Sequence, residues 1–180
     1  MMKHLTELLD EPATPALVVV ITTSGEGVAE LLAGQLQAGK FSLVAGHERR
    51  LPAYEVAKIL HWRRANIKKL FSENLLARAP TCFQLVDILQ RAGAISDPLL
   101  VTDFLYTFYD ADLRLDIRWQ VFRRCLSRLQ LLARFRRVTV IIRDGEGEDF
   151  DIFFPSLERA ANELLRVEPE GRQAIQLGLI

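Results

Sequence analysis

The sequence predicts an α/β fold in which a mostly parallel sheet carries helices on both faces. Short apolar segments rich in β-branched residues, such as residues 16–22 and 137–143, are typical of buried central strands. Between such segments, apolar residues recur every three or four positions, which indicates amphipathic helices. Because a strand–helix–strand succession usually leaves its two strands parallel in one sheet, the alternation favours a three-layer arrangement.

The expected elements alternate along the whole chain. An amphipathic helix at residues 5–10 and a proline-containing loop form an N-terminal extension of residues 1–15. The expected strands are residues 16–22, 41–45, 74–79, 98–105 and 137–143. The expected helices are residues 28–37, 53–64, 67–71, 83–92, 113–135 and 155–162. Two last strands, 163–167 and 173–177, are predicted to form an antiparallel hairpin across the turn at residues 169–171. Since the sequence shows no repeat or linker, we expect a single domain over residues 1–180.

Local signals support several of these boundaries. Gly25 and Gly27 form a turn after the first strand, and Gly39 stops the helix that follows. Thr81 can cap the start of the helix at residues 83–92, and Gly93 can end it.

The predicted helix at residues 113–135 has apolar side chains on two sides. The expected core stripe, at three- to four-residue spacing, consists of Leu115, Trp119, Phe122, Leu126, Leu129 and Ala133. A second apolar set consists of Ile117, Val121, Leu131, Leu132 and Phe135. A helix with two apolar sides is either buried on both or offers one to a partner, and the sequence leaves both interpretations open.

The composition excludes several classes of protein. Hydrophobic residues make up 49% of the 180 residues and the formal net charge is +0, so no global field attracts nucleic acid or a membrane. The longest apolar run near the start, residues 16–21, is too short to span a bilayer. Cys82 and Cys125 lie in predicted helices with no ligand-like neighbours, so we expect buried free thiols, no metal site and a cytoplasmic protein.

Four stretches together resemble the RecA-like ATPase core, nearest to the RecA/RadA recombinase branch. Residues 74–81 with the helix after them are similar to the family's "ARA" strand, and residues 98–103 resemble its Walker B strand. The succession from 106 to 142 matches the family's order, and residues 160–168 resemble its closing strand. The resemblance implies a P-loop NTPase-type three-layer fold and domains that assemble side by side.

The sequence departs from this family where the nucleotide should bind. A phosphate loop needs the pattern Gly-x-x-x-x-Gly-Lys-Ser/Thr, whose backbone amides and lysine hold the phosphates. Here the corresponding positions include Ser24, Gly25 and Gly27, with no lysine and with Glu26 adding negative charge. We therefore expect no nucleotide cofactor and interpret these positions as vestigial.

Two acidic residues are the vestigial candidates for catalysis. Asp103 ends the Walker B-like strand, where the resemblance implies a Mg²⁺ anchor; alternatively, it caps a turn or pairs with a nearby arginine. Glu48 matches the family's catalytic acid only after a shift of one residue.

Basic residues offer a second possible site. Arginines are frequent between residues 114 and 137, and the nucleic-acid candidates are Arg114, Arg118, Arg124 and Arg128, with Tyr106 and Tyr109 stacking on bases. The resemblance places one of two DNA-binding loops just before this helix. However, the second loop, residues 144–151, is rich in acids that repel phosphate. A second basic group is His47, Arg49, Arg50, Arg63, Arg64, Lys68 and Lys69. The alternative for the arginines is a solvated helix face on which they pair with Asp112 or Asp116.

Three functions remain open from the sequence. The first is a RecA-like domain without ATPase activity that acts as an accessory protein in DNA recombination or repair, with a protein partner or a second copy of itself. The second is a protein that binds single-stranded nucleic acid through the arginine-rich helix. The third is an NTPase with an atypical phosphate site built around Asp103 and Glu48.

Overall fold

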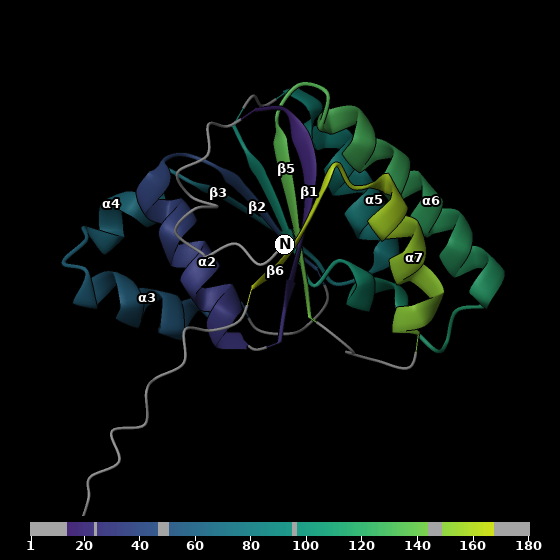
Figure 1. Cartoon of the computed structure of the whole chain (residues 1–180), viewed down its shortest axis with the longest axis horizontal. Coiled ribbons are helices and arrows are strands. Elements are labelled where there is room, and N and C mark those ends of the chain that lie inside the picture. Colours follow the sequence, from purple (N-terminus) through teal and green to yellow (C-terminus); the bar gives the residue numbers. More distant parts are fainter. Residues whose placement is uncertain (1–13, 24, 47–50, 95–96, 144–148, 168–180) are drawn as a thin grey trace, which may run out of the picture.

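The computed structural model describes residues 14–23, 25–46, 51–94, 97–143 and 149–167. They form a six-stranded sheet in the order β3-β2-β4-β5-β1-β6, in which every pairing is parallel (Figure 1). The strands are β1 (Ala16–Thr22), β2 (Ser42–Gly46), β3 (Leu75–Ala79), β4 (Leu99–Thr102), β5 (Arg137–Arg143) and β6 (Glu163–Val167). The predicted α/β class is therefore confirmed.

Helices cover both faces of the sheet. Figure 1 shows α2 (Gly25–Ala38), α3 (Ala53–Trp62) and α4 (Ile67–Ser72) on one side. The other side carries α5 (Cys82–Arg91), α6 (Leu115–Leu132) and α7 (Phe150–Ala160). Two short 3₁₀ helices, η1 (Ala92–Ala94) and η2 (Leu105–Phe108), flank β4. None of the described helices combines the length and apolar character that crossing a lipid bilayer requires.

The central strands are apolar throughout because both of their faces are buried. In β1, Val19 packs toward α5 and α6, whereas Val18 and Val20 pack toward α2 and α3. Successive side chains of the strand point to opposite faces of the sheet, so one strand contributes residues to two separate cores. This explains why the sequence shows a continuous apolar run there.

The C-terminal hairpin is not supported by the structure. β6 is a strand as predicted, but it pairs in parallel with β1, from Val18 to Thr22. Residues 173–177, the expected second strand, lie outside the described residues, as does the expected helix at residues 5–10. The sheet of the described chain is parallel throughout.

Two predicted boundaries were wrong for identifiable reasons. The strand expected at residues 98–105 ends at Thr102, because Asp103 adopts a φ of 53°, outside the extended region, and η2 follows. The last helix begins at Phe150, five residues before Pro155, which lies inside it. Proline usually marks the start of a helix, and here that preference misled the prediction.

The core stripe of α6 differs partly from the predicted one. Its buried residues are Val121, Phe122, Cys125, Leu129 and Leu132. Leu115, expected in the core, is 42% exposed, whereas Val121 and Leu132, from the second apolar set, are buried. Much of that second set therefore belongs to the core, and Phe135 and Leu131 are its exposed members.

Candidate functional site

The carboxyl edge of the sheet is where a nucleotide would bind in a parallel α/β fold. β1 ends at Thr22 and α2 begins at Gly25, so only two residues connect strand and helix. Gly25 and Gly27 therefore belong to the first turn of α2, which starts three residues earlier than predicted. Ser24 and Glu48 lie outside the described residues, and the structure does not place them.

Asp103 stands at the same edge, at the end of β4. Its backbone oxygen accepts hydrogen bonds from the Thr107 hydroxyl, at 3.1 Å, and from the Thr107 amide, at 3.3 Å. This turn packs against the end of β2 so closely that a Cβ added to Gly46 would lie 2.4 Å from Thr107 Oγ1. The backbone of Asp103 is therefore held by a tight turn that only glycine at position 46 can accommodate.

A cation that the sequence analysis missed lies near this edge. Arg143 ends β5, and a Cβ added to Gly25 would lie 3.9 Å from its Nη2 atom. The guanidinium group of Arg143 is therefore close to the first turn of α2. In the sequence, Arg143 could have been noticed as a charged residue at the end of a buried strand. Its position near α2 could not have been predicted, because it depends on β5 lying next to β1 in the sheet.

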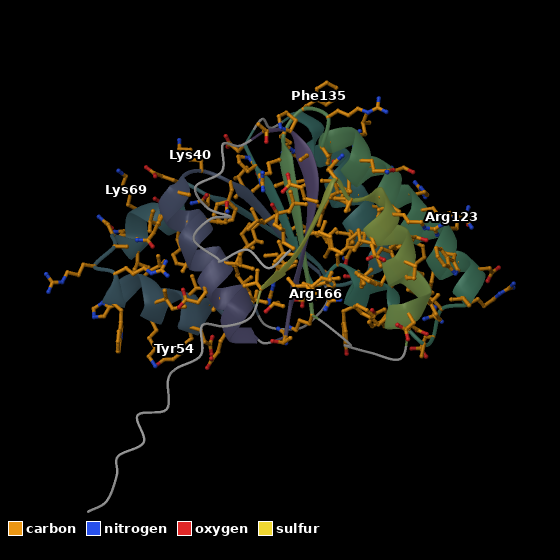
Figure 2. All side chains as sticks on the ribbon, in the orientation of Figure 1. Lys40, Tyr54, Lys69, Arg123, Phe135 and Arg166 are labelled. Atoms are coloured by element: carbon orange, nitrogen blue, oxygen red, sulfur yellow. The ribbon has the colours of Figure 1, made fainter. Side chains whose placement is uncertain are left out.

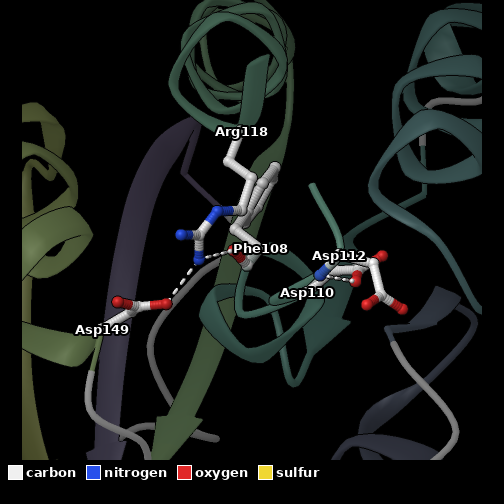
Figure 3. Close-up of polar contacts among 5 residues, drawn as sticks. All are labelled: Phe108, Asp110, Asp112, Arg118 and Asp149. Atoms are coloured by element: carbon white, nitrogen blue, oxygen red, sulfur yellow. Dashed lines mark hydrogen bonds and ion pairs between the residues drawn. The ribbon is translucent and has the colours of Figure 1, made fainter. Parts of the chain in front are cut away.

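Two of the four candidate arginines stabilise the fold. Arg118, whose side chain is 12% exposed, donates to Asp149 Oδ2 at 2.5 Å and to the backbone oxygen of Phe108 at 3.3 Å (Figure 3). Arg128 donates to the backbone oxygens of Leu89 and Gln90, at the C-terminus of α5, at 3.0 and 2.9 Å. Both guanidinium groups therefore form hydrogen bonds within the fold.

The other two candidates lie at the surface. Arg114 is exposed and forms a bidentate pair with Asp116, with hydrogen bonds of 3.1 and 2.9 Å. Pairing of Asp116 with a neighbouring arginine was predicted and is confirmed, but the partner lies two residues away and not at the expected i, i+4 spacing. Arg124 is exposed on α6. Two of the four candidate arginines are therefore exposed, and the other two are partly buried and bonded within the fold.

The two candidate stacking residues pack within the protein. The ring of Tyr109 stacks on Phe153 with 6.4 Å between centroids, and Tyr106 meets Tyr109 edge-on at 5.5 Å. Burial, reinforced by the negative charges of Asp149 and Asp151, raises the pKa of the Tyr109 hydroxyl. Tyr109 thus contributes to the aromatic core beneath η2.

The second basic group lies on the opposite flank of the sheet, as far as the structure describes it. Arg63 pairs with Glu30 at 2.6 Å and donates to Gln37, whereas Arg64, Lys68 and Lys69 are exposed. Across the described ranges, no three histidine, cysteine or acidic side chains come together as metal ligands could.

No protein-family model and no curated protein matches the chain. Among solved structures, it resembles one described as the crystal structure of the RadB recombinase, with a TM-score of 0.71. The match covers 94% of this chain and 83% of the other, at 18% sequence identity. The chain has a RecA-like fold. At this identity the likeness shows the architecture alone, and it confirms the fold that the sequence suggested.

Proposed function

We propose that this RecA-like domain does not hydrolyse ATP and serves as an accessory or interaction protein in DNA recombination or repair. The observation that carries the proposal is the direct passage from β1 into α2, with two residues between Thr22 and Gly25. A phosphate loop wraps several consecutive backbone amides around the phosphates before its helix begins. A connection of two residues is too short to provide several backbone amides for binding phosphates.

The charges at the same place support the proposal. The first turn of α2 carries Glu26, and the segment from Thr22 to Ala29 has no lysine. A phosphate loop places a lysine against the β- and γ-phosphates, whereas a carboxylate there repels them. Proteins hold Mg²⁺ mostly through one or two carboxylates together with substrate phosphates, so Asp103 would need a bound phosphate beside it to anchor the ion.

A phosphate-release assay tests the absence of hydrolysis. The full chain with ATP and Mg²⁺ should release phosphate at the rate of a buffer blank, and Asp103→Asn should not change that rate. A wild-type rate well above the blank that falls in Asp103→Asn would reject the proposal.

The link to recombination is supported by the likeness to the RadB recombinase. Deletion of the gene should sensitise the cell that carries it to double-strand breaks, and a copy with Asp103→Asn should restore resistance fully. A deletion strain as resistant as its parent would remove this link.

The position of Arg143 favours one alternative, an NTPase with an atypical phosphate site. Its guanidinium group near Gly25 could supply the positive charge that the missing lysine would have provided. This alternative predicts that Arg143→Ala abolishes a measurable ATP affinity. The main proposal predicts no such affinity in either protein.

The exposed Arg124 and Arg114 keep the nucleic-acid alternative testable. Fluorescence anisotropy with single-stranded DNA should show binding that weakens steeply with salt if these arginines contact phosphates. Arg124→Ala should then reduce the affinity, whereas our main proposal predicts no difference between the two proteins.

A further inference from the structure

Exposed apolar side chains are concentrated on one flank of the described molecule. Of the nine large hydrophobic side chains that are exposed there, five lie between residues 54 and 76. These five are Tyr54 and Trp62, both 78% exposed, Leu76 at 57%, Leu75 at 56% and Phe71 at 42%. Leu75 and Leu76 belong to β3, the edge strand of the sheet. Clustered apolar exposure beside a sheet edge is typical of an interaction surface.

An apolar cleft opens within this flank. It has a volume of about 50 Å³ and lies between α2, the start of α3, the end of α4 and β3. Phe71, Leu75 and Leu76 form part of its wall, with Leu36 and Val56 from the neighbouring helices. A volume of this order admits the end of one aliphatic or aromatic side chain.

A polar cleft of about 350 Å³ adjoins the apolar one, and the two share Leu36 and Asn74 as wall residues. The side-chain oxygen of Asn74 is already occupied by the Phe41 amide, at 2.8 Å. Lys40 and Lys69 line the polar cleft, and Figure 2 shows both lysines on this flank, away from Arg123. Glu73 is the single acid that lines it.

The flank is net positive in a chain of zero net charge. From Tyr54 to Leu76 the sequence holds five lysine or arginine residues and two acids, Glu55 and Glu73, so the rest of the chain is net negative. Arg63 is paired with Glu30, while Arg64, Lys68 and Lys69 are exposed. Such a patch raises the local concentration of acidic partners by long-range attraction.

We propose that the two clefts together bind an acidic segment of a partner protein, with one large apolar residue as its anchor. The anchor enters the apolar cleft beside Leu76, and the acidic residues next to it lie over Lys40 and Lys69. This inference rests on the proposed role as an interaction protein and names the chemistry of the partner.

The observations favour a protein segment over other polyanions. Leu75, Leu76 and the apolar cleft offer aliphatic contacts. An apolar side chain of a protein can bury itself against them, whereas the phosphates and sugars of a nucleic acid cannot. A membrane surface would need a helix with a free apolar face. The apolar face of α3 instead buries Val56 and Leu60 against the molecule, and α4, which has no buried residue, is only six residues long.

Selection from a library of random 12-residue peptides on the immobilised full chain tests the proposal. Enriched peptides should carry an excess of Asp and Glu around a large apolar residue. In fluorescence anisotropy, the best labelled peptide should lose at least about tenfold in affinity with Leu76→Ser and with Lys40→Glu/Lys69→Glu. Phe135→Ser and Arg123→Glu/Arg134→Glu, at exposed sites outside both clefts and outside the basic flank, are the matched controls and should bind as the wild type does.

Four outcomes would overturn the proposal: no enrichment over a blank surface, enriched peptides without acidic residues, equal binding by cleft and control variants, or displacement of the peptide by a 20-nucleotide oligo(dT). Circular dichroism confirms that each variant is folded. Failure here is distinguishable from failure of the proposed function, because ATP hydrolysis is measured separately and concerns the carboxyl edge of the sheet.

Discussion

Replacing Gly46 with alanine should strongly destabilise the chain. The added Cβ would lie 2.4 Å from Thr107 Oγ1, 2.9 Å from the backbone oxygen of Asp103 and 3.0 Å from that of Thr102. The Thr107 side chain could rotate away, but two of the three contacts are backbone atoms at the end of β4. Because β4 pairs directly with β2, neither strand can move without disturbing the sheet.

The size of the effect follows from these contacts. Overpacking in a rigid interior costs about 1–3 kcal/mol, and backbone contacts place this site at the upper end. Rotation of Thr107 would also break its hydrogen bond to Asp103, worth about 1 kcal/mol. We therefore expect Gly46→Ala to lower the free energy of unfolding by about 3–4 kcal/mol, a large part of the stability of a typical domain.

Urea unfolding followed by circular dichroism measures this loss, and Gly25→Ala is the matched control. At Gly25 an added Cβ meets only Arg143 Nη2, at 3.9 Å, which is an ordinary contact, and the position is helical. The control should therefore be neutral or gain up to about 1 kcal/mol. If Gly46→Ala proved as stable as the wild type, the packing of the Asp103 turn against β2 described above would be wrong.

Three further predictions concern single side chains. Arg136 is buried and donates to the backbone oxygens of Ala92 and Asp97, so Arg136→Met should cost about 2 kcal/mol in urea unfolding; an unchanged midpoint would mean that these bonds contribute nothing. Thr81 caps α5 in a capping box, so Thr81→Ala should cost about 1 kcal/mol by the same measurement, and a stabilised variant would contradict the capping. Burial raises the pKa of the Cys125 thiol to about 12. The pKa of this thiol is higher in the folded than in the unfolded state. The contribution of Cys125 to the free energy of unfolding is therefore complete below about pH 8.5 and is lost as the pH rises toward 12. Between pH 8 and 10.5, the midpoint of thermal unfolding should therefore fall less steeply with pH in Cys125→Ala than in the wild type. Equal slopes of the midpoint against pH in the two proteins would refute this.

Strands and their order of appearance were predictable because burial on both faces leaves an apolar signature in the sequence. The expected strand at residues 74–79 differs from β3 by one residue. The conformation of Asp103 was not predictable, because it depends on packing against Gly46, which belongs to a neighbouring strand. Local patterns contain no information about such contacts.

The roles of the arginines illustrate the same limit. The sequence places Arg118 and Arg128 on one helix but not their partners, Asp149 and Leu89, which are 31 and 39 residues away along the chain. The exposed leucines of β3 were likewise missed, since only the strand order makes β3 an edge. Composition therefore counts the basic residues correctly, but it does not show which of them form hydrogen bonds within the fold.

Calorimetric titration of the full chain with ATP and Mg²⁺ tests most directly whether this RecA-like frame has lost its nucleotide site. With two residues between β1 and α2 and a carboxylate at Glu26, we predict no binding heat up to about 1 mM ATP. A dissociation constant in the micromolar range would contradict the account.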